Sequence, residues 1–257
     1  MARNDWNREQ LILAINLYWK IPFGQMHSRN KHVQHLATLI GRTPGAVARK
    51  LGNFASFDPQ HKKRDVHGLP NAGQLTESIW YEFYDNLNTL AYESEKLLAS
   101  IEKKPIESLV PLEPEIWQLK EGKEKERLIK ARVNQRFFRD MILASYNEAC
   151  CITGIKQRSL LVASHISPWS KDELNRMNPQ NGLCLNALHD KAFDNFLITV
   201  TPDYHIKVSN KLKKQSKSLG IQQSFIQYEG QKIILPKRYL PSPEFLSEHN
   251  KKFNERN

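Results

Sequence analysis

Residues 6–55 carry apolar side chains at the three- and four-residue intervals that are typical of helices packed on one face. A first helix is predicted from about Trp6 to Trp19, and Pro22-Phe23-Gly24 ends it. A second helix is predicted to end at Gly41. Thr43-Pro44 then offers an N-cap followed by a proline at the first helical position, which predicts a third helix from Pro44 to about Phe54.

Three short helices with a basic third one form the arrangement of a helix-turn-helix module. The stretch GRTPGAVARKL at residues 41–51 resembles the last helix of Myb/SANT-type modules. Arg49 and Lys50 are predicted to point outward from this helix, and Arg42 precedes it, so these three residues are candidate DNA contacts. A three-helix unit can equally be an interaction or packing module, and the sequence leaves both roles open.

The next apolar pattern predicts one long helix from about Leu75 to Ile101. The stretch EKKPIESLVPLEPE that follows has three prolines and no clear period, which is typical of a linker. We therefore expect a helical domain at residues 1–101 that binds DNA or a partner, a linker at 102–121 and a second domain at 122–257.

A helix is predicted to open the second domain from about Gly122. Arg132, Arg136 and Arg139 share one of its faces. A stripe of arginines is ordinarily a solvated surface, but in a basic chain it can also bind phosphates. The opposite face carries the apolar positions Ile129, Val133, Phe137 or Phe138, Ile142 and Leu143.

After Cys151 the pattern changes to short strands, at about 159–165, 196–201 and 204–209. The segment NGLCLNALHDKAF at 181–193 predicts a short strand that enters a helix. The fold class is therefore α+β and mostly helical.

The composition of the chain indicates which class of partner it binds and in which cell compartment it lies. The chain has 38 Lys and Arg against 27 Asp and Glu, a formal net charge of +11, which favours polyanionic partners such as nucleic acid. The three cysteines, two of them adjacent, indicate no disulfide framework. No apolar stretch approaches the ~20 residues that cross a bilayer, and the polar start MARNDWNREQ is unlike a secretory signal. We expect a cytoplasmic protein without a membrane partner.

His165, Asn181 and His189 follow one another as a strand-end histidine, a loop asparagine and a helix histidine. In this order and spacing the region resembles the HNH nuclease family, whose ββα-metal motif packs two strands and a helix around a divalent ion. The stretches ASHISPW and NGLCLNALHDKAFDNFLITV bear the closest resemblance, to a stand-alone bacterial restriction-type subgroup. The resemblance covers about residues 130–210, with the core motif at 150–210.

The resemblance implies a role for each of these residues. His165 matches the general base, which takes a proton from water at neutral pH. Asn181 matches the residue that orients this imidazole, and His189 matches the helix ligand of one Mg²⁺ or Mn²⁺ ion. Lys191 could stabilise charge on the phosphate, although it could equally be an ordinary surface lysine.

The sequence departs from the family pattern at the second metal ligand. Ser164, a weak ligand, precedes the base where many members have an acidic residue or a histidine. Phe193 stands one helical turn after His189, where others have a ligand. Asp194 and Asp190 are the candidates for the missing oxygen, although helical geometry turns Asp194 away from the face of His189.

Some family members hold a structural zinc on two Cys-x-x-Cys clips. Here Cys151 lacks its second cysteine and Cys184 is out of phase with the second clip, so a structural zinc is not expected.

These observations favour a divalent-metal-dependent DNA endonuclease, acting in bacterial restriction or phage defence on double-stranded DNA. One site cuts one strand, so a double-strand break would need a homodimer or two successive events. Two other interpretations remain open: a DNA-binding protein whose nuclease site has decayed, and a toxin-like nuclease without sequence choice.

Overall fold

The computed structural model describes residues 5–65, 68–109, 122–169, 172 and 174–257. The chain divides into two compact units, Met1–Met141 and Ile142–Asn257. The boundary falls within helix α9 (Lys123–Ser145), so the helix predicted from Gly122 contributes residues to both units.

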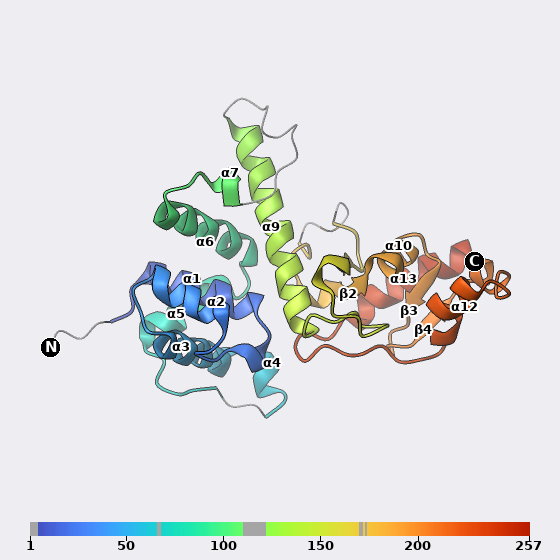
Figure 1. Ribbon diagram of the computed structural model, residues 1–257, viewed down its shortest axis with the longest axis horizontal. Coiled ribbons are helices and arrows are strands. Elements are labelled where there is room, and N and C mark those ends of the chain that lie inside the picture. The colour runs from blue at the N-terminus through green and yellow to red at the C-terminus, as the bar shows by residue number, and fades with distance from the viewer. Residues whose placement is uncertain (1–4, 66–67, 110–121, 170–171, 173) are drawn as a thin grey trace. The chain divides into compact units, whose positions relative to one another are not determined.

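Three helices open the first unit, as the apolar pattern predicts (Figure 1). They are α1 (Arg8–Lys20), α2 (Lys31–Leu39) and α3 (Pro44–Phe57). The Thr43 hydroxyl accepts from the backbone N–H of Ala46, and Pro44 occupies the first turn, which confirms the predicted cap. A 3-10 turn (Phe23–Gln25) follows α1, and the short α4 (Pro59–Lys62) follows α3.

The prediction of one long helix over 75–101 is wrong. The structure has two helices, α5 (Gln74–Phe83) and α6 (Leu87–Glu102). Asn86 leaves the helical conformation at φ −123° and ψ 46°, and its side chain donates to the backbone oxygen of Glu82. An asparagine side chain that competes for backbone groups in this way interrupts a helix.

Large aromatic side chains fill the core of this unit. Trp19 and Trp80 stack with ring centroids 6.2 Å apart, and Tyr18 meets Trp80 edge-on at 5.6 Å. All three are 1% exposed or less, so α1 and α5 are held together by burial of aromatic area.

The predicted linker at 102–121 is described only in part. Residues 110–121 lie outside the described residues, and the remainder includes a short helix, α7 (Ile106–Leu109). Along α9 the predicted apolar face is confirmed, and Phe137 and Phe138 are both 1% exposed.

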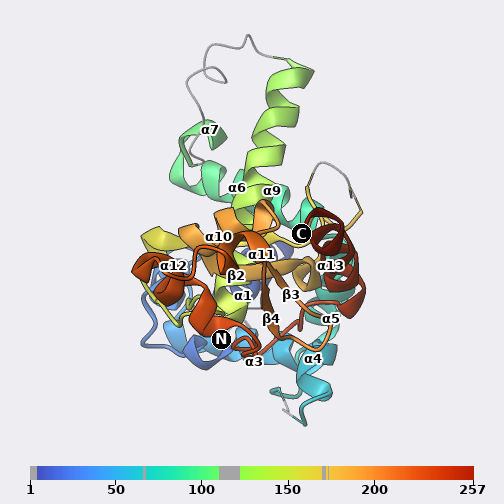
Figure 2. The same ribbon diagram turned by 90° about the vertical axis from the view of Figure 1, so that its right-hand side faces the viewer.

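The second unit is built on two strand pairs and a short helix (Figures 1 and 2). Strands β1 (Leu161–His165) and β2 (Gly182–Asn186) are antiparallel, and His165 lies opposite Gly182. Helix α10 (Ala187–Asp194) follows β2 directly and packs on both strands. The hairpin of β3 (Ile198–Val200) and β4 (Ile206–Val208) comes next.

The strand predicted at 159–165 begins later than expected, because a 3-10 turn (Arg158–Leu160) takes its first positions. A second such turn (Pro179–Asn181) precedes β2. Helices α11 (Asn210–Lys213), α12 (Leu219–Ser224) and α13 (Pro243–Arg256) complete the unit, with a further 3-10 turn (Ile226–Tyr228) after α12.

Helix α13 covers the β3 strand and the end of α10. Its His249 stacks on Phe193 with ring centroids 3.7 Å apart and shares a 2.8 Å hydrogen bond with the Thr199 hydroxyl. The tail of the chain is therefore part of the core that holds α10 in place.

Cys150, Cys151 and Cys184 are free thiols, and all three are buried. No helix among the described residues has the length and apolar character that a membrane span requires.

Candidate active site

His165 ends β1, where the strand gives way to the loop that leads to β2. Its ring Nε2 lies 3.1 Å from the backbone oxygen of Arg176. Because a carbonyl can only accept, Nε2 carries the proton, and Nδ1 is the basic nitrogen of the neutral ring. Burial lowers the pKa of His165, and the bond to Arg176 only partly opposes this, so the ring is neutral at neutral pH. Trp169 packs edge-on against the ring at 5.3 Å.

Asn181 is fully buried, and both ends of its amide bind the loop that follows β1. Nδ2 donates to the backbone oxygens of Ser167 at 3.1 Å and Asn175 at 3.2 Å, and Oδ1 accepts from the Ser167 N–H at 2.7 Å. Both amide hydrogens are thus donated to backbone carbonyls of the loop. Since Arg176 follows Asn175, the amide bonds to the same loop segment whose Arg176 carbonyl accepts from His165.

His189 lies on the inward face of α10 and is 2% exposed. Its Nε2 donates to the backbone oxygen of Ser224 at 2.7 Å, and its Nδ1 accepts from the Asn186 amide at 2.9 Å. The sequence predicted a metal ligand here, but the structure has both ring nitrogens bonded within the protein. The end of α12 occupies the direction in which Nε2 would meet an ion.

A buried polar cluster surrounds His189. Burial raises the pKa of the Cys150 thiol, but hydrogen bonds with His189 and Thr153 outweigh it and bring that pKa down to about 7. A pocket of about 420 Å³ opens beside this cluster. Its lining is mainly apolar and includes neither His165 nor Asp190, so the pocket lies apart from the groups that could perform hydrolysis.

Asp190 and Asp194 lie four residues apart on α10, so both carboxyls project from one side of the helix. Burial raises the pKa of both, and the charge of Asp190 raises that of Asp194 further. The hydroxyl of Ser164, on β1, lies beside Asp190 and lowers its pKa in part. This hydroxyl is buried and has no hydrogen bond of ordinary geometry. Two carboxyls on one side of α10, with a buried hydroxyl beside one of them, are oxygen groups of the kind that bind a divalent cation.

These oxygen atoms fit Mg²⁺, which proteins often bind through one or two carboxylates while water and phosphate fill its other positions. Among the residues that the structure describes, no three His, Cys, Asp or Glu side chains gather as a complete metal shell. Asp194 does turn away from the face of His189, as expected, but it shares the face of Asp190.

Lys191 is exposed on α10 between the two carboxyls. Its charge lowers the pKa of both Asp190 and Asp194, opposing the effect of their burial. The ammonium group therefore lies within electrostatic range of both carboxyls.

Two of the three DNA contacts predicted in the first unit support the helices themselves. Lys50 is 8% exposed, and its Nζ donates to the Thr76 hydroxyl at 2.9 Å. The prediction that Lys50 points outward is wrong, because α3 turns this side chain toward α5. Arg42 donates to the Gln10 side chain at 2.8 Å, and its guanidinium lies 5.0 Å from the centroid of the Trp6 ring. Arg49 is exposed.

The arginine stripe of α9 is only partly open to solvent. Arg136 is exposed, whereas Arg132 and Arg139 are half-buried, and Arg132 donates to the Gln135 side chain at 3.0 Å. Phosphate binding by this face stays a prediction.

The sequence does contain the signal for the Asp190–Asp194 pair, since carboxyls four apart on a helix share a face. The sequence alone offered no sign of the bond from His189 to Ser224, which lies 35 residues further along the chain.

Residues 150–201 match a family model described as HNH endonuclease. The matched segment contains β1, β2, α10 and β3, and with them His165, Asn181, His189 and both α10 carboxylates. The match confirms the predicted HNH family for this segment. A search of curated proteins finds none that matches the chain.

Proposed function

We propose that this chain, which carries an HNH endonuclease domain at residues 150–201, hydrolyses phosphodiester bonds of double-stranded DNA with the help of one divalent ion. The observation that carries the proposal is that the Ser164 hydroxyl, from the residue before His165 on β1, lies beside Asp190, with Asp194 on the same side of α10. A base and a cation site on neighbouring residues are what hydrolysis of a phosphodiester requires.

His165 acts as the general base in this proposal. Its Nε2–H is held by the Arg176 carbonyl, so Nδ1 takes the proton from the attacking water. The water oxygen forms a bond to phosphorus, the bond to the leaving sugar oxygen breaks, and that oxygen gains a proton from solvent. Asn181 is a positioning residue, since it fixes the loop that holds the imidazole.

Asp190 and Asp194 would hold Mg²⁺ or Mn²⁺, with the Ser164 hydroxyl beside them. When bound, such an ion neutralises charge on the scissile phosphate and on the leaving oxygen. Lys191 lies at the same edge and contributes a further positive charge to the phosphate. His189 supports α10 from within the domain, through its bonds to Asn186 and Ser224.

Restriction or phage defence is the biological role that this activity favours, with a homodimer where both strands are cut. One specific observation favours the alternative of a decayed site: both nitrogens of His189 are bonded inside the protein. A decayed site would leave DNA binding intact and abolish cleavage. A toxin-like nuclease would also cut RNA and single strands.

A substrate panel tests the proposal. Purified protein is incubated with linear duplex DNA, single-stranded DNA and RNA of one sequence, with Mg²⁺, with Mn²⁺ and with EDTA. We expect cleavage of the duplex with either ion and none with EDTA. Binding of duplex DNA without cleavage under all conditions would support the decayed site, and equal cleavage of all three substrates would support the toxin-like enzyme.

A further inference from the structure

The segment from Lys207 to Ser218 contains five lysines and no acidic residue. It begins in β4, continues through α11 and ends just before α12. Apart from Lys207, which is half-buried, these lysines are exposed. We call the set consisting of Lys207, Lys211, Lys213, Lys214 and Lys217 the lysine surface.

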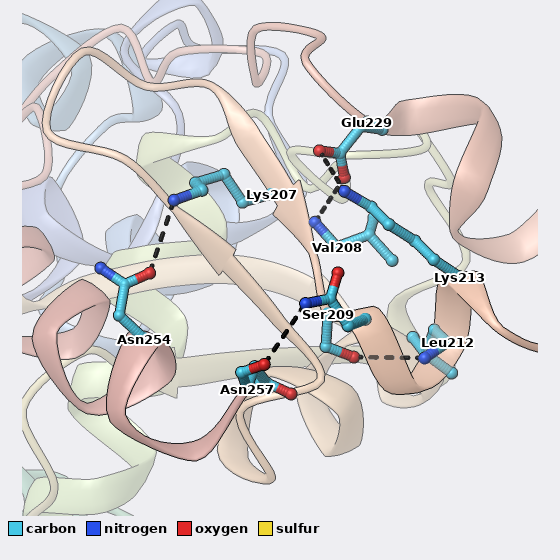
Figure 3. Close-up of polar contacts among 9 residues, drawn as sticks. Lys207, Val208, Ser209, Leu212, Lys213, Glu229, Asn254 and Asn257 are labelled. Carbon is cyan, nitrogen blue, oxygen red and sulfur yellow. Dashed lines mark hydrogen bonds and ion pairs between the residues drawn. The ribbon is translucent and has the colours of Figure 1, made fainter.

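The backbone beneath the lysine surface is well held (Figure 3). The Ser209 hydroxyl caps α11 by accepting from the Leu212 N–H, and Leu212 is 6% exposed. The Glu229 carboxylate accepts from the Val208 N–H at 2.6 Å. The lysine surface therefore projects from a backbone that these hydrogen bonds hold in place.

Few acidic groups neutralise this charge. Glu229 pairs with Lys213 at 2.9 Å, and Lys207 reaches the Asn254 side chain at 3.5 Å (Figure 3). Within the part of the chain that the structure describes, Lys211, Lys214 and Lys217 make no ion pair. A run of exposed positive charges with few counter-charges favours a polyanionic partner.

The lysine surface is joined to the candidate active site by the turn that follows α10. The Ser209 N–H donates to the Leu197 carbonyl at 2.9 Å, and Leu197 lies three residues after Asp194. In the same turn, the Arg256 guanidinium lies over the Phe196 ring, 4.3 Å from the ring centroid. A DNA strand with one phosphate at Asp194 would therefore have the lysine surface and Arg256 near its adjacent phosphates.

We propose that the lysine surface, with Arg256, binds the phosphate backbone of duplex DNA to one side of the scissile phosphate. This inference rests on the proposed nuclease function and assigns it an anchoring surface outside the matched residues 150–201. Lysine ammonium groups bind phosphates as point charges, so this contact positions DNA without reading its sequence. Such a contact needs lysine side chains that are open to solvent and a backbone that holds them in place, and the lysine surface has both.

The test uses Lys211→Gln, Lys214→Gln and Lys217→Gln together, in the His165→Ala background so that the DNA stays intact. Duplex binding is measured by fluorescence anisotropy over a series of salt concentrations. Removing one lysine–phosphate interaction should reduce the slope of log K against log salt by about 0.9, so removing three should reduce it by about 2.7. In the nuclease-competent background KM should rise while kcat stays unchanged.

The matched control is Lys31→Gln, Lys63→Gln and Lys156→Gln, three exposed lysines outside the lysine surface. It removes the same charge and should leave most of the slope intact. Equal reductions of the salt slope in both triple variants would overturn the proposal. An unchanged slope in the variant of Lys211, Lys214 and Lys217 would also overturn it, even if the enzyme still cleaves DNA. Weaker binding of duplex RNA but not of DNA would overturn the assigned partner. Absence of any cleavage by the parent enzyme would instead contradict the proposed function.

Discussion

At the residue scale, the candidate site depends on which side of α10 each side chain faces. His189 and Phe193 face inward, where they are 2% and 1% exposed. Asp190 and Asp194 lie on the neighbouring face, half-buried and exposed respectively, and the charge of Asp190 raises the pKa of Asp194. The inward pair stabilises the helix, and the acidic pair is left available for an ion.

Replacing Asp194 with Asn should separate ion binding from stability. Cleavage and the Mg²⁺-induced rise in melting temperature should both be abolished, because one of two carboxylate ligands is removed. In EDTA the variant should be as stable as the wild type or more stable by about 0.2–0.5 kcal/mol, since a like-charge pair on one helix face is relieved. Thermal unfolding with and without Mg²⁺ measures both effects.

The control for that variant is Glu248→Gln, an exposed carboxylate on α13 that should leave the Mg²⁺ response unchanged. An undiminished Mg²⁺ shift in Asp194→Asn would show that the ion binds elsewhere.

Lys50→Ala tests the internal role of a residue predicted from sequence to contact DNA. The ammonium bonds to the Thr76 hydroxyl at 2.9 Å and to the Ala72 carbonyl at 3.2 Å. Its removal leaves these groups without a partner, so we expect a stability loss of about 1–3 kcal/mol in urea unfolding. Arg49→Ala, at the exposed neighbouring position, should change stability by less than about 0.5 kcal/mol. Equal stability of the two variants would contradict this role.

His249 should make the stability of the second unit depend on pH. Burial lowers its pKa to about 4, against 6.5 in the unfolded chain. The folded state therefore binds fewer protons, so its stability is constant above pH 6.5 and falls as pH drops toward 4. The loss approaches about 1.4 kcal/mol per pH unit and about 3 kcal/mol in all.

The measurement is urea unfolding of the wild type and His249→Gln from pH 7.5 to pH 4. The variant should begin less stable at pH 7.5, since it loses the stack on Phe193, and should show a shallower decline. Parallel declines in the two proteins would assign the pH dependence to other groups.

At the element scale, short segments are held by hydrogen bonds between side chains and backbone groups. Asn181 fixes the loop after β1, Asn186 caps α10, and Glu229 binds the end of β4. The bonds made by Asn181 and Glu229 join residues 14 and 21 positions apart, whereas the Asn186 cap is local to α10. The site is therefore positioned by polar contacts within loops as much as by its two strands.

Asn181→Asp tests the bonds between Asn181 and the loop. The carboxylate keeps the size and the acceptor but cannot donate to the carbonyls of Ser167 and Asn175. We expect a stability loss of about 1–3 kcal/mol, together with a fall in kcat that exceeds any change in KM. Unfolding and steady-state cleavage measure these effects. A variant with wild-type kcat would show that the loop holds His165 without the amide.

Local patterns predicted the elements that form through local signals. Thr43-Pro44 starts α3 as expected, and the apolar face of α9 is buried as predicted. The predictions that failed depend on distant partners or on competition for backbone groups: Lys50 turns toward Thr76, and Asn86 divides a helix that apolar spacing alone makes continuous. The three motif positions in the matched segment were visible in the sequence. Their bonds to Ser224, Asn175 and Arg176 were not, because these require the folded loops.

At the scale of the whole molecule, a net charge of +11 favours DNA as a partner but does not say where it binds. The first unit uses two of its predicted basic contacts internally, through Arg42 and Lys50. The second unit holds the matched HNH segment and, separately, the lysine surface. Cutting and anchoring are thus both proposed for residues 142–257, while the role of the first unit stays a prediction.

The central claim is that His165 is the base of a metal-dependent nuclease, and nicking of supercoiled plasmid tests it most directly. Wild type and His165→Ala are compared side by side with Mg²⁺ and with EDTA, after both show the same melting temperature and the same affinity for DNA. We predict nicking by the wild type with Mg²⁺ only, and a loss of at least about a hundredfold in the variant. Undiminished nicking by His165→Ala would contradict the account.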